Sequence, residues 1–198
     1  MFIAGVPWWH FLVLAGPAVA GMGAMIVFTP FRVARLMALQ NPWALDNPTS
    51  YQPRESLMAV LGGGWTGLGL GNGFQKLGYL PEVSTDFIFA HYCEEWGFFG
   101  AVLLMGLVAA WIWHARRASL RSGDSFGRVL AASVGFLIAS QAVMHMAVNL
   151  VAIPPTGVPF PFMSAGGTAL VMTAFAAALL VSVTAHRADD PGLALTRR

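Results

Sequence analysis

Residues 79–95, YLPEVSTDFIFAHYCEE, place four carboxylates around a short apolar run. Glu82 and Asp86 precede the run FIFA, and a pair of glutamates follows it. The apolar segment 97–113 comes next and, with its flanks, is long enough to cross a bilayer. An ionised carboxylate at bilayer depth costs about 2.5–3.5 kcal/mol on insertion scales. We therefore expect these carboxylates at the membrane interface or facing a polar cavity.

The composition indicates an integral membrane protein. Of the 198 residues, 57% are hydrophobic and 10% are charged, and the mean hydropathy is +0.65. Soluble domains carry about 25% charged residues, so this balance is typical of a chain that lies in a bilayer. The small net charge of +2 gives no reason to expect nucleic-acid binding. The single cysteine, Cys93, excludes an internal disulfide and a cysteine-based zinc site.

Hydropathy predicts an all-α integral membrane protein with four transmembrane helices. Each apolar run is close to the roughly 20 residues that cross a bilayer core. The expected spans cover about residues 9–28, 95–113, 129–153 and 167–184. The segment 29–94 is rich in glycine and proline, so we expect a long extracytoplasmic loop there, with a short amphipathic helix at residues 55–61.

Basic residues set the expected orientation. They concentrate in the segment 114–128 and in the tail 185–198, and the positive-inside rule places both in the cytoplasm. The loops 29–94 and 154–166 then face outside. Four cations lie on that outer side against the usual bias, which would suit an anionic ligand; they are Arg32, Arg35, Arg54 and Lys76.

Asp86 is the candidate for chemistry. It follows a threonine and opens an apolar run, so it could be the N-cap of a helix, a position that aspartate favours. Polar groups crowd the dozen residues before it, and Gln75 and Glu82 among them are candidates for binding a substrate. A carboxylate in such a partly dry cleft can serve as a general base. Both interpretations stay open from the residues alone.

Arg54 and Lys76 are the candidates for holding phosphate. Arginine binds phosphate oxygens with two parallel hydrogen bonds, while lysine acts as a point charge. Arg32 and Arg35 could equally anchor lipid headgroups at the interface. His91 lies one helical turn before the glutamate pair, so a metal site is conceivable, although electrostatics at the start of a helix explains the same pattern.

Two further segments carry polar or conformationally special residues. Gln141, His145 and Asn149 recur every four residues and would form either hydrogen bonds between membrane helices or the polar wall of a cavity, with Gln141 as the substrate-binding candidate. The loop 154–162 is too rich in proline for a helix. It leads to a helix start whose free N–H groups would suit an anion; the candidates there are Ser164, Gly166, Gly167 and Thr168.

The glycine-rich stretch 62–71 is the remaining special segment. Its pattern GLGLG superficially resembles a nucleotide fingerprint, but no strand precedes it and no βαβ unit fits here. We expect this backbone to lie close to a ligand or to a neighbouring helix.

Taken together, these segments resemble the SEDS family of bacterial cell-wall polymerases. Four blocks carry the resemblance, and in order they are NPW at 41–43, GLGLGNGFQK at 67–76, YLPEVSTDFIFAHYCEE at 79–95 and PPTGVPFPFMSAGGT at 154–168. The first two are more similar to the members that act in cell division than to those that act in elongation. Family members usually have ten spans, and this sequence resembles the last four.

The resemblance implies glycan polymerisation from lipid II at the bacterial cytoplasmic (inner) membrane. Asp86 takes the place of the family's essential aspartate, expected to remove the proton from an acceptor sugar hydroxyl. Arg54, Lys76 or a divalent cation, Mg²⁺ or Mn²⁺, would neutralise the departing pyrophosphate. The implied partners are lipid II, the growing glycan strand, a class B penicillin-binding protein that acts as transpeptidase, and other division proteins.

Two other functions remain open from the sequence, a lipid II flippase and a non-catalytic membrane scaffold for a transpeptidase. The chain begins almost inside a span and has no convincing cleavable signal peptide, so we expect a truncated form or a fragment of a longer protein. Local departures from the family pattern are His145 in place of an asparagine, Ala165 in place of an aromatic residue and Cys93 in place of a glycine.

Overall fold

Three long helices form the membrane part of this computed structural model. The structure describes residues 9, 13, 15–17, 19–21, 23, 28–44, 48–74 and 85–188. Within these residues, three helices are long and apolar enough to cross a membrane, and they are α4 (Ile88–Arg121), α5 (Ser125–Asn149) and α6 (Gly167–Ala188). They correspond to the last three predicted spans. The first predicted span, 9–28, lies largely outside the described residues.

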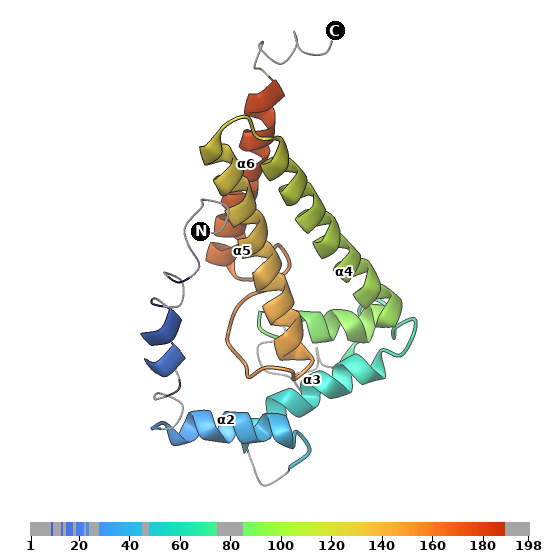
Figure 1. Cartoon of the computed structure of the whole chain (residues 1–198). Helices are drawn as coiled ribbons and strands as arrows, with labels where there is room; N and C mark the ends of the chain where they lie inside the picture. The colour runs from blue at the N-terminus through green and yellow to red at the C-terminus, as the bar shows by residue number, and fades with distance from the viewer. Residues whose placement is uncertain are drawn as a thin grey trace.

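Helices α4 and α5 form an antiparallel hairpin (Figure 1). They approach closely where small residues meet, because a Cβ on Gly135 would lie 2.3 Å from the Cβ of Ala115. The Asp124 carboxylate accepts a hydrogen bond from Gly127 N at 2.9 Å and so caps the start of α5. The loop predicted at 114–128 is therefore only the turn 122–124, because both helices continue into the basic segment.

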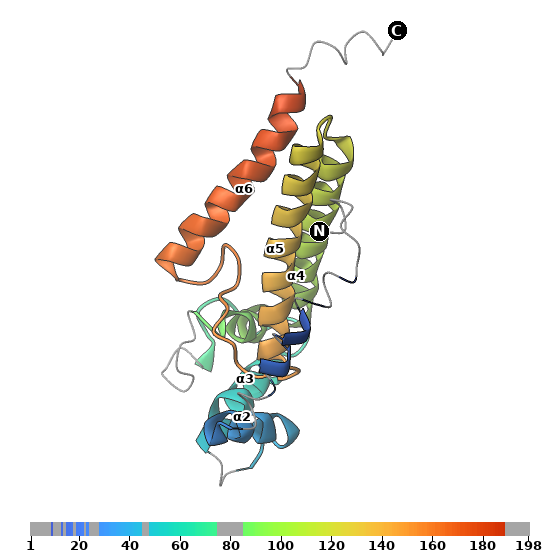
Figure 2. The same cartoon turned by 60° about the vertical axis from the view of Figure 1, so that its left-hand side comes forward.

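Helix α6 packs against this hairpin near that turn and diverges from it towards the other end (Figure 2). Leu180 of α6 shares a buried apolar cluster with Ala131 and Ile138 of α5 and Ala118 of α4. The cluster holds the three helices together at the end that the basic residues assign to the cytoplasm.

The described part of the segment 29–94 is largely helical, which corrects the expectation of one long loop. It contains α2 (Pro30–Gln40), the 3₁₀ turn η2 (Pro48–Ser50) and α3 (Tyr51–Gly62). The short helix predicted at 55–61 lies within α3 and is confirmed. Figure 1 shows α2 and α3 near the start of α4, at the end of the bundle away from the 122–124 turn.

Helix α4 is broken at Gly97, whose φ of 64° and ψ of −161° are not helical. A break leaves carbonyls unpaired on one side and N–H groups unpaired on the other. The glycine-rich turn after α3 pairs both sets. Leu68 N and Gly69 N donate to the carbonyls of Glu94 and Glu95, at 3.0 and 3.1 Å. The N–H groups of Phe98 and Phe99 donate to Gly64 O and Trp65 O, at 2.9 and 3.2 Å.

Glycine is required where this turn meets the broken helix. A Cβ on Gly63 would lie 2.0 Å from Cys93 O, and one on Gly67 would lie 2.0 Å from Glu95 O. Gly67 also has a φ of 79°, which disfavours any side chain. The expectation that this stretch lies against a neighbouring helix is confirmed.

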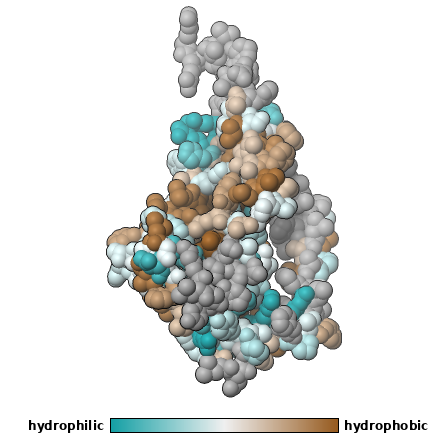
Figure 3. All heavy atoms as spheres, turned by 180° about the vertical axis from the view of Figure 1, so that it is seen from behind, coloured by the Kyte–Doolittle hydropathy of each residue, from teal (hydrophilic) through white to brown (hydrophobic). Residues whose placement is uncertain are grey.

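The surface of the molecule is divided into an apolar region over the long helices and polar regions near their ends. Seen from behind, hydrophobic residues gather over the long helices, and hydrophilic residues gather near both ends of them (Figure 3). Exposed apolar side chains are abundant on α4 and α6, and they include Leu103, Leu107, Val171 and Phe175. Such a surface is suited to lipid or to further membrane helices.

We predict that Gly67→Ala destabilises the protein by more than about 2 kcal/mol, because the strain of a positive φ adds about 1–2 kcal/mol to a clash with Glu95 O. Thermal unfolding in detergent micelles measures the effect. Gly71→Ala is the matched control, since its φ is 84° but no atom lies within 4 Å of its Cβ. Equal losses in the two variants would show that the close approach adds nothing.

A second prediction concerns orientation across the membrane. A cysteine at the exposed position Ser125, beside the 122–124 turn, should resist an impermeant thiol reagent in intact cells. A cysteine at the exposed Gln40, at the end of α2, should react with the same reagent. Native Cys93 is buried and gives a low background. The reverse labelling pattern would overturn the orientation.

Candidate functional site

The backbone around Asp86 is held by Asn149, the last residue of α5. Asn149 is fully buried, and its side-chain amide donates to Asp86 O at 3.0 Å and to His145 O at 2.9 Å. Its side-chain oxygen accepts from Ala90 N at 2.9 Å. The Ser56 hydroxyl of α3 in turn donates to Asn149 O at 2.7 Å. One buried amide therefore joins α5 to the start of α4.

A second contact fixes the residue before Asp86. The buried hydroxyl of Ser164 donates to Thr85 O at 2.8 Å and accepts from Phe160 N at 2.7 Å. Ser164 was predicted to bind substrate. In the structure its hydroxyl connects the loop between α5 and α6 to the Asp86 segment.

The Asp86 carboxylate is less constrained than its backbone. Asp86 is half-buried, and a Cβ on Gly157 would lie 3.8 Å from its Oδ2, so the carboxylate lies beside the glycine of the proline-rich loop. The N-cap of α4 is Phe87 rather than Asp86, and the Ala90 N–H in the first turn of α4 donates to Asn149 Oδ1. The interpretation of Asp86 as a helix cap is therefore wrong. The carboxylate remains available for another task.

His145 lies one turn before Asn149 and is also buried, with 1% of its surface exposed. Its Nδ1 lies 2.8 Å from Val158 O, and because a carbonyl only accepts, Nδ1 carries the proton. The other ring nitrogen, Nε2, is buried with no hydrogen-bond partner among the described residues.

Two residues of the polar stripe on α5 match the first interpretation, hydrogen bonding between packed elements. His145 and Asn149 form hydrogen bonds to the loop and to the Asp86 segment, as polar groups between packed elements do. Gln141 lies one helical turn before His145 and is half-buried. Its role as a substrate ligand stays a prediction.

Of the two residues predicted to hold phosphate, Arg54 lies within the described residues and Lys76 lies outside them. The Arg54 guanidinium lies 3.2 Å from Glu55 Oε1 and 5.6 Å from the ring centroid of Tyr51. Arg35 of α2 reaches the proline-rich loop, where it donates to Pro155 O at 3.4 Å. The candidates Gln75, Lys76 and Glu82 lie outside the described residues.

Glu94 and Glu95, the last two residues of the segment 79–95, bind the glycine-rich turn and the residues that follow it. Glu94 Oε1 accepts from Phe74 N at 2.8 Å, and Glu95 Oε1 accepts from Gly71 N at 2.9 Å. His91 lies between them, 3.5 Å from Glu94 Oε2 and 3.3 Å from Glu95 Oε1. Within the described residues no group of three or more His, Cys, Asp or Glu is arranged to hold a metal ion. The predicted divalent cation stays a prediction.

The start of α6 is open to its surroundings. Gly167 and Thr168 are exposed and Gly166 is half-buried. Their predicted role in binding an anion is therefore sterically possible and stays a prediction.

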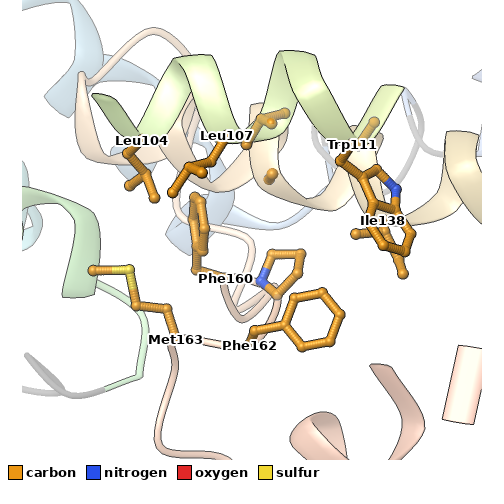
Figure 4. Close-up of a pocket in the computed structure, with 11 residues that line it drawn as sticks. Leu104, Leu107, Trp111, Ile138, Phe160, Phe162 and Met163 are labelled. Carbon is orange, nitrogen blue, oxygen red and sulfur yellow. The ribbon is translucent and has the colours of Figure 1, made fainter. Parts of the chain in front are cut away.

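An apolar cavity of about 240 Å³ adjoins the loop that carries Ser164 (Figure 4). Phe160, Phe162 and Met163 of that loop form one wall, and Leu104 and Trp111 of α4 lie on the other side. Phe162 has a φ of 61°, a strained conformation for a side chain of this size. The loop thus contacts the Asp86 segment through its polar residues and the cavity through its aromatic residues.

Sequence reasoning did not include Asn149, Ser56 or Gly157 among the site residues. A buried asparagine in a membrane helix was visible as a signal, because such groups need partners. Ser56 and Gly157 gave no signal, since their role depends on which elements come together.

Comparison with known proteins supports the resemblance seen in the motifs. The family model for the FtsW, RodA and SpoVE cell cycle proteins matches residues 1–189. The chain belongs to this family. It is 42% identical to the probable peptidoglycan glycosyltransferase FtsW of Saccharophagus degradans, over 97% of this chain and 51% of that protein. The FtsW of Nitrosococcus halophilus is 39% identical, over 92% and 48% of the two chains.

The fold of this family member agrees with a solved structure. A chain described under "Structural coordination of polymerization and crosslinking by a peptidoglycan synthase complex" superposes with a TM-score of 0.71 at 23% identity. The match covers 96% of this chain and 54% of that one. This member of the family also spans about half the length of the curated relatives it matches.

We predict that Asn149→Asp destabilises this family member by about 1–3 kcal/mol. The change keeps the shape but removes both amide donors, so it leaves buried carbonyls unpaired. Thermal unfolding in micelles measures the loss. Ser140→Ala on the same helix is the control, because its exposed hydroxyl bonds only to Leu137 O. An unchanged midpoint for Asn149→Asp would show that these hydrogen bonds contribute little.

Proposed function

We propose that this chain supplies the catalytic half of a peptidoglycan glycosyltransferase that polymerises lipid II during cell division. The observation that carries the proposal is the geometry at Asp86. Hydrogen bonds from the buried side chains of Asn149 and Ser164 fix the backbone on both sides, while the carboxylate stays partly exposed beside Gly157. A catalytic base needs a fixed position and access to the substrate proton. The names of the curated relatives support the same reaction.

In the proposed reaction, Asp86 accepts the proton of the acceptor sugar's 4-hydroxyl. The oxygen attacks the anomeric carbon of the growing glycan, and the bond from that carbon to the pyrophosphate oxygen breaks. Undecaprenyl pyrophosphate leaves with the bonding electrons. A new glycosidic bond has then replaced one glycosyl phosphate bond, and the proton resides on Asp86.

The departing pyrophosphate needs positive charge close by. Arg54 is the described candidate, and it would have to exchange Glu55 for phosphate, which offers arginine similar two-point hydrogen bonding. Lys76 is the second candidate.

We also propose that a class B penicillin-binding protein and other division proteins assemble with the complete enzyme in the bacterial inner membrane. The solved chain with the similar fold is described as part of a peptidoglycan synthase complex. This description supports an assembly of the same kind here. Polymerisation of purified lipid II should be measured with this chain alone, with a transpeptidase partner, and with six further spans supplied by a relative. Activity only in the last case supports a catalytic half. No activity in any case would favour a scaffold.

We predict that Asp86→Asn abolishes glycan polymerisation while leaving folding intact. Asparagine keeps the shape but cannot accept the proton, and general-base catalysis contributes about 10²–10⁴-fold in rate. The assay uses this chain joined to its missing half, or a full-length relative changed at the matching position, with gel analysis of glycan length. Thermal unfolding at the wild-type midpoint is the control for folding. Polymerisation at near wild-type rate would transfer the role of base to Glu82, the nearest other carboxylate along the sequence.

A further inference from the structure

One face of α4 lines two cavities in succession. The cavity near the middle of the helix is apolar and includes Leu104, Leu107 and Trp111. The next turns of the same face line a second, polar cavity with His114, Arg117 and Arg121. These residues follow spacings of three and four, so they form one continuous stripe along the helix. The stripe changes from apolar to basic between Trp111 and His114.

The polar cavity is a space between α4 and α6 rather than a flat surface. Its volume is about 460 Å³, and Val183 and Thr184 of α6 form its opposite side. Two guanidinium groups at one cavity are suited to a phosphate group, which arginine binds with two parallel hydrogen bonds.

The apolar cavity continues the same face towards the membrane interior. The indole Nε1–H of Trp111 is buried there and has no hydrogen-bond partner among the described residues. The ring lies beside Phe162, with 6.1 Å between centroids. An apolar ligand with a polar group at this depth would fill the cavity and could also accept from the indole.

The dimensions match one leaflet of a bilayer. From Leu104 to His114 the helix rises about 15 Å, at about 1.5 Å per residue, which is half of the roughly 30 Å hydrocarbon core. From His114 to Arg121 it rises about 10 Å more, which reaches through the headgroup region. A phospholipid has the same order of groups, with acyl chains followed by a phosphate.

We propose that an anionic phospholipid of the cytoplasmic leaflet binds between α4 and α6. Its phosphate contacts Arg117 and Arg121, and an acyl chain runs past Trp111 into the apolar cavity. The charge complementarity, the order of the two cavities and the divergence of α6 from the hairpin support this occupant (Figure 2). The proposal depends on the membrane orientation and not on glycosyl transfer, so each can fail separately.

A simpler explanation of these arginines is the positive-inside rule, by which any basic residue near the cytoplasm orients the chain. Arg116 and Arg128 provide a matched control for it. Both are exposed and lie in the same basic segment, but neither lines the cavity. If only overall charge attracted lipid, either pair of arginines would contribute equally.

The test is native mass spectrometry of the delipidated full chain, titrated with dioleoylphosphatidylglycerol or dioleoylphosphatidylcholine in micelles. We expect tight binding of the first lipid alone, and an affinity at least about tenfold lower in Arg117→Gln/Arg121→Gln. Arg116→Gln/Arg128→Gln should stay within about twofold of wild type. Equal losses in the two double variants, or equal binding of both lipids, would overturn the proposal.

Two further measurements keep the result interpretable. Thr184→Phe fills the polar cavity from α6 without changing charge, and Thr184 bonds only to Val181 O, so folding should persist. It should weaken phosphatidylglycerol binding as the arginine variant does, and unchanged binding would contradict the site. Inorganic phosphate at millimolar concentration should not displace the lipid. Displacement would identify a soluble anion as the ligand and overturn the lipid proposal.

Discussion

The break in α4 at Gly97 is the constraint on which the site depends. A continuous helix over Ile88–Arg121 would be about 51 Å long, far more than the roughly 30 Å hydrocarbon core requires. The break lets the first turns lie across the end of the bundle (Figure 1). Asp86, just before them, is thereby placed against the end of α5. Backbone groups freed by a break are costly near lipid, so the glycine-rich turn that pairs them is a condition for the site to exist.

The polar groups around Asp86 form two sets, one buried and one partly exposed. Asn149, Ser56 and Ser164 are buried, and each forms a hydrogen bond with a backbone atom of another element. The Asp86 carboxylate is bound by none of them and stays partly exposed. The buried set fixes the position of the carboxylate, because unpairing any of its members leaves a desolvated polar atom. The exposed group remains able to interact with a substrate.

The sequence predicted the three described membrane helices because their apolar runs match the bilayer thickness. It also predicted the close approach of the glycine-rich stretch, since repeated glycine indicates backbone contact. It did not predict that α4 extends from Ile88 to Arg121, because positively charged residues continue a helix beyond the hydrocarbon region without any hydropathy signal. Asn149 and Ser56 were not recognised as ligands of the Asp86 segment, because three elements distant in sequence must meet before their partners are defined.

The loop between α5 and α6 connects the two regions that carry the functional proposals. Val158 O and Ser164 of this loop contact His145 and Thr85, next to the proposed base. Phe160 packs its ring against His145, with 5.4 Å between centroids, and also forms a wall of the apolar cavity. A lipid chain in that cavity would contact the same residue that supports His145. Phe160 is therefore the residue through which the wall of the cavity contacts the end of α5 that holds the Asp86 segment.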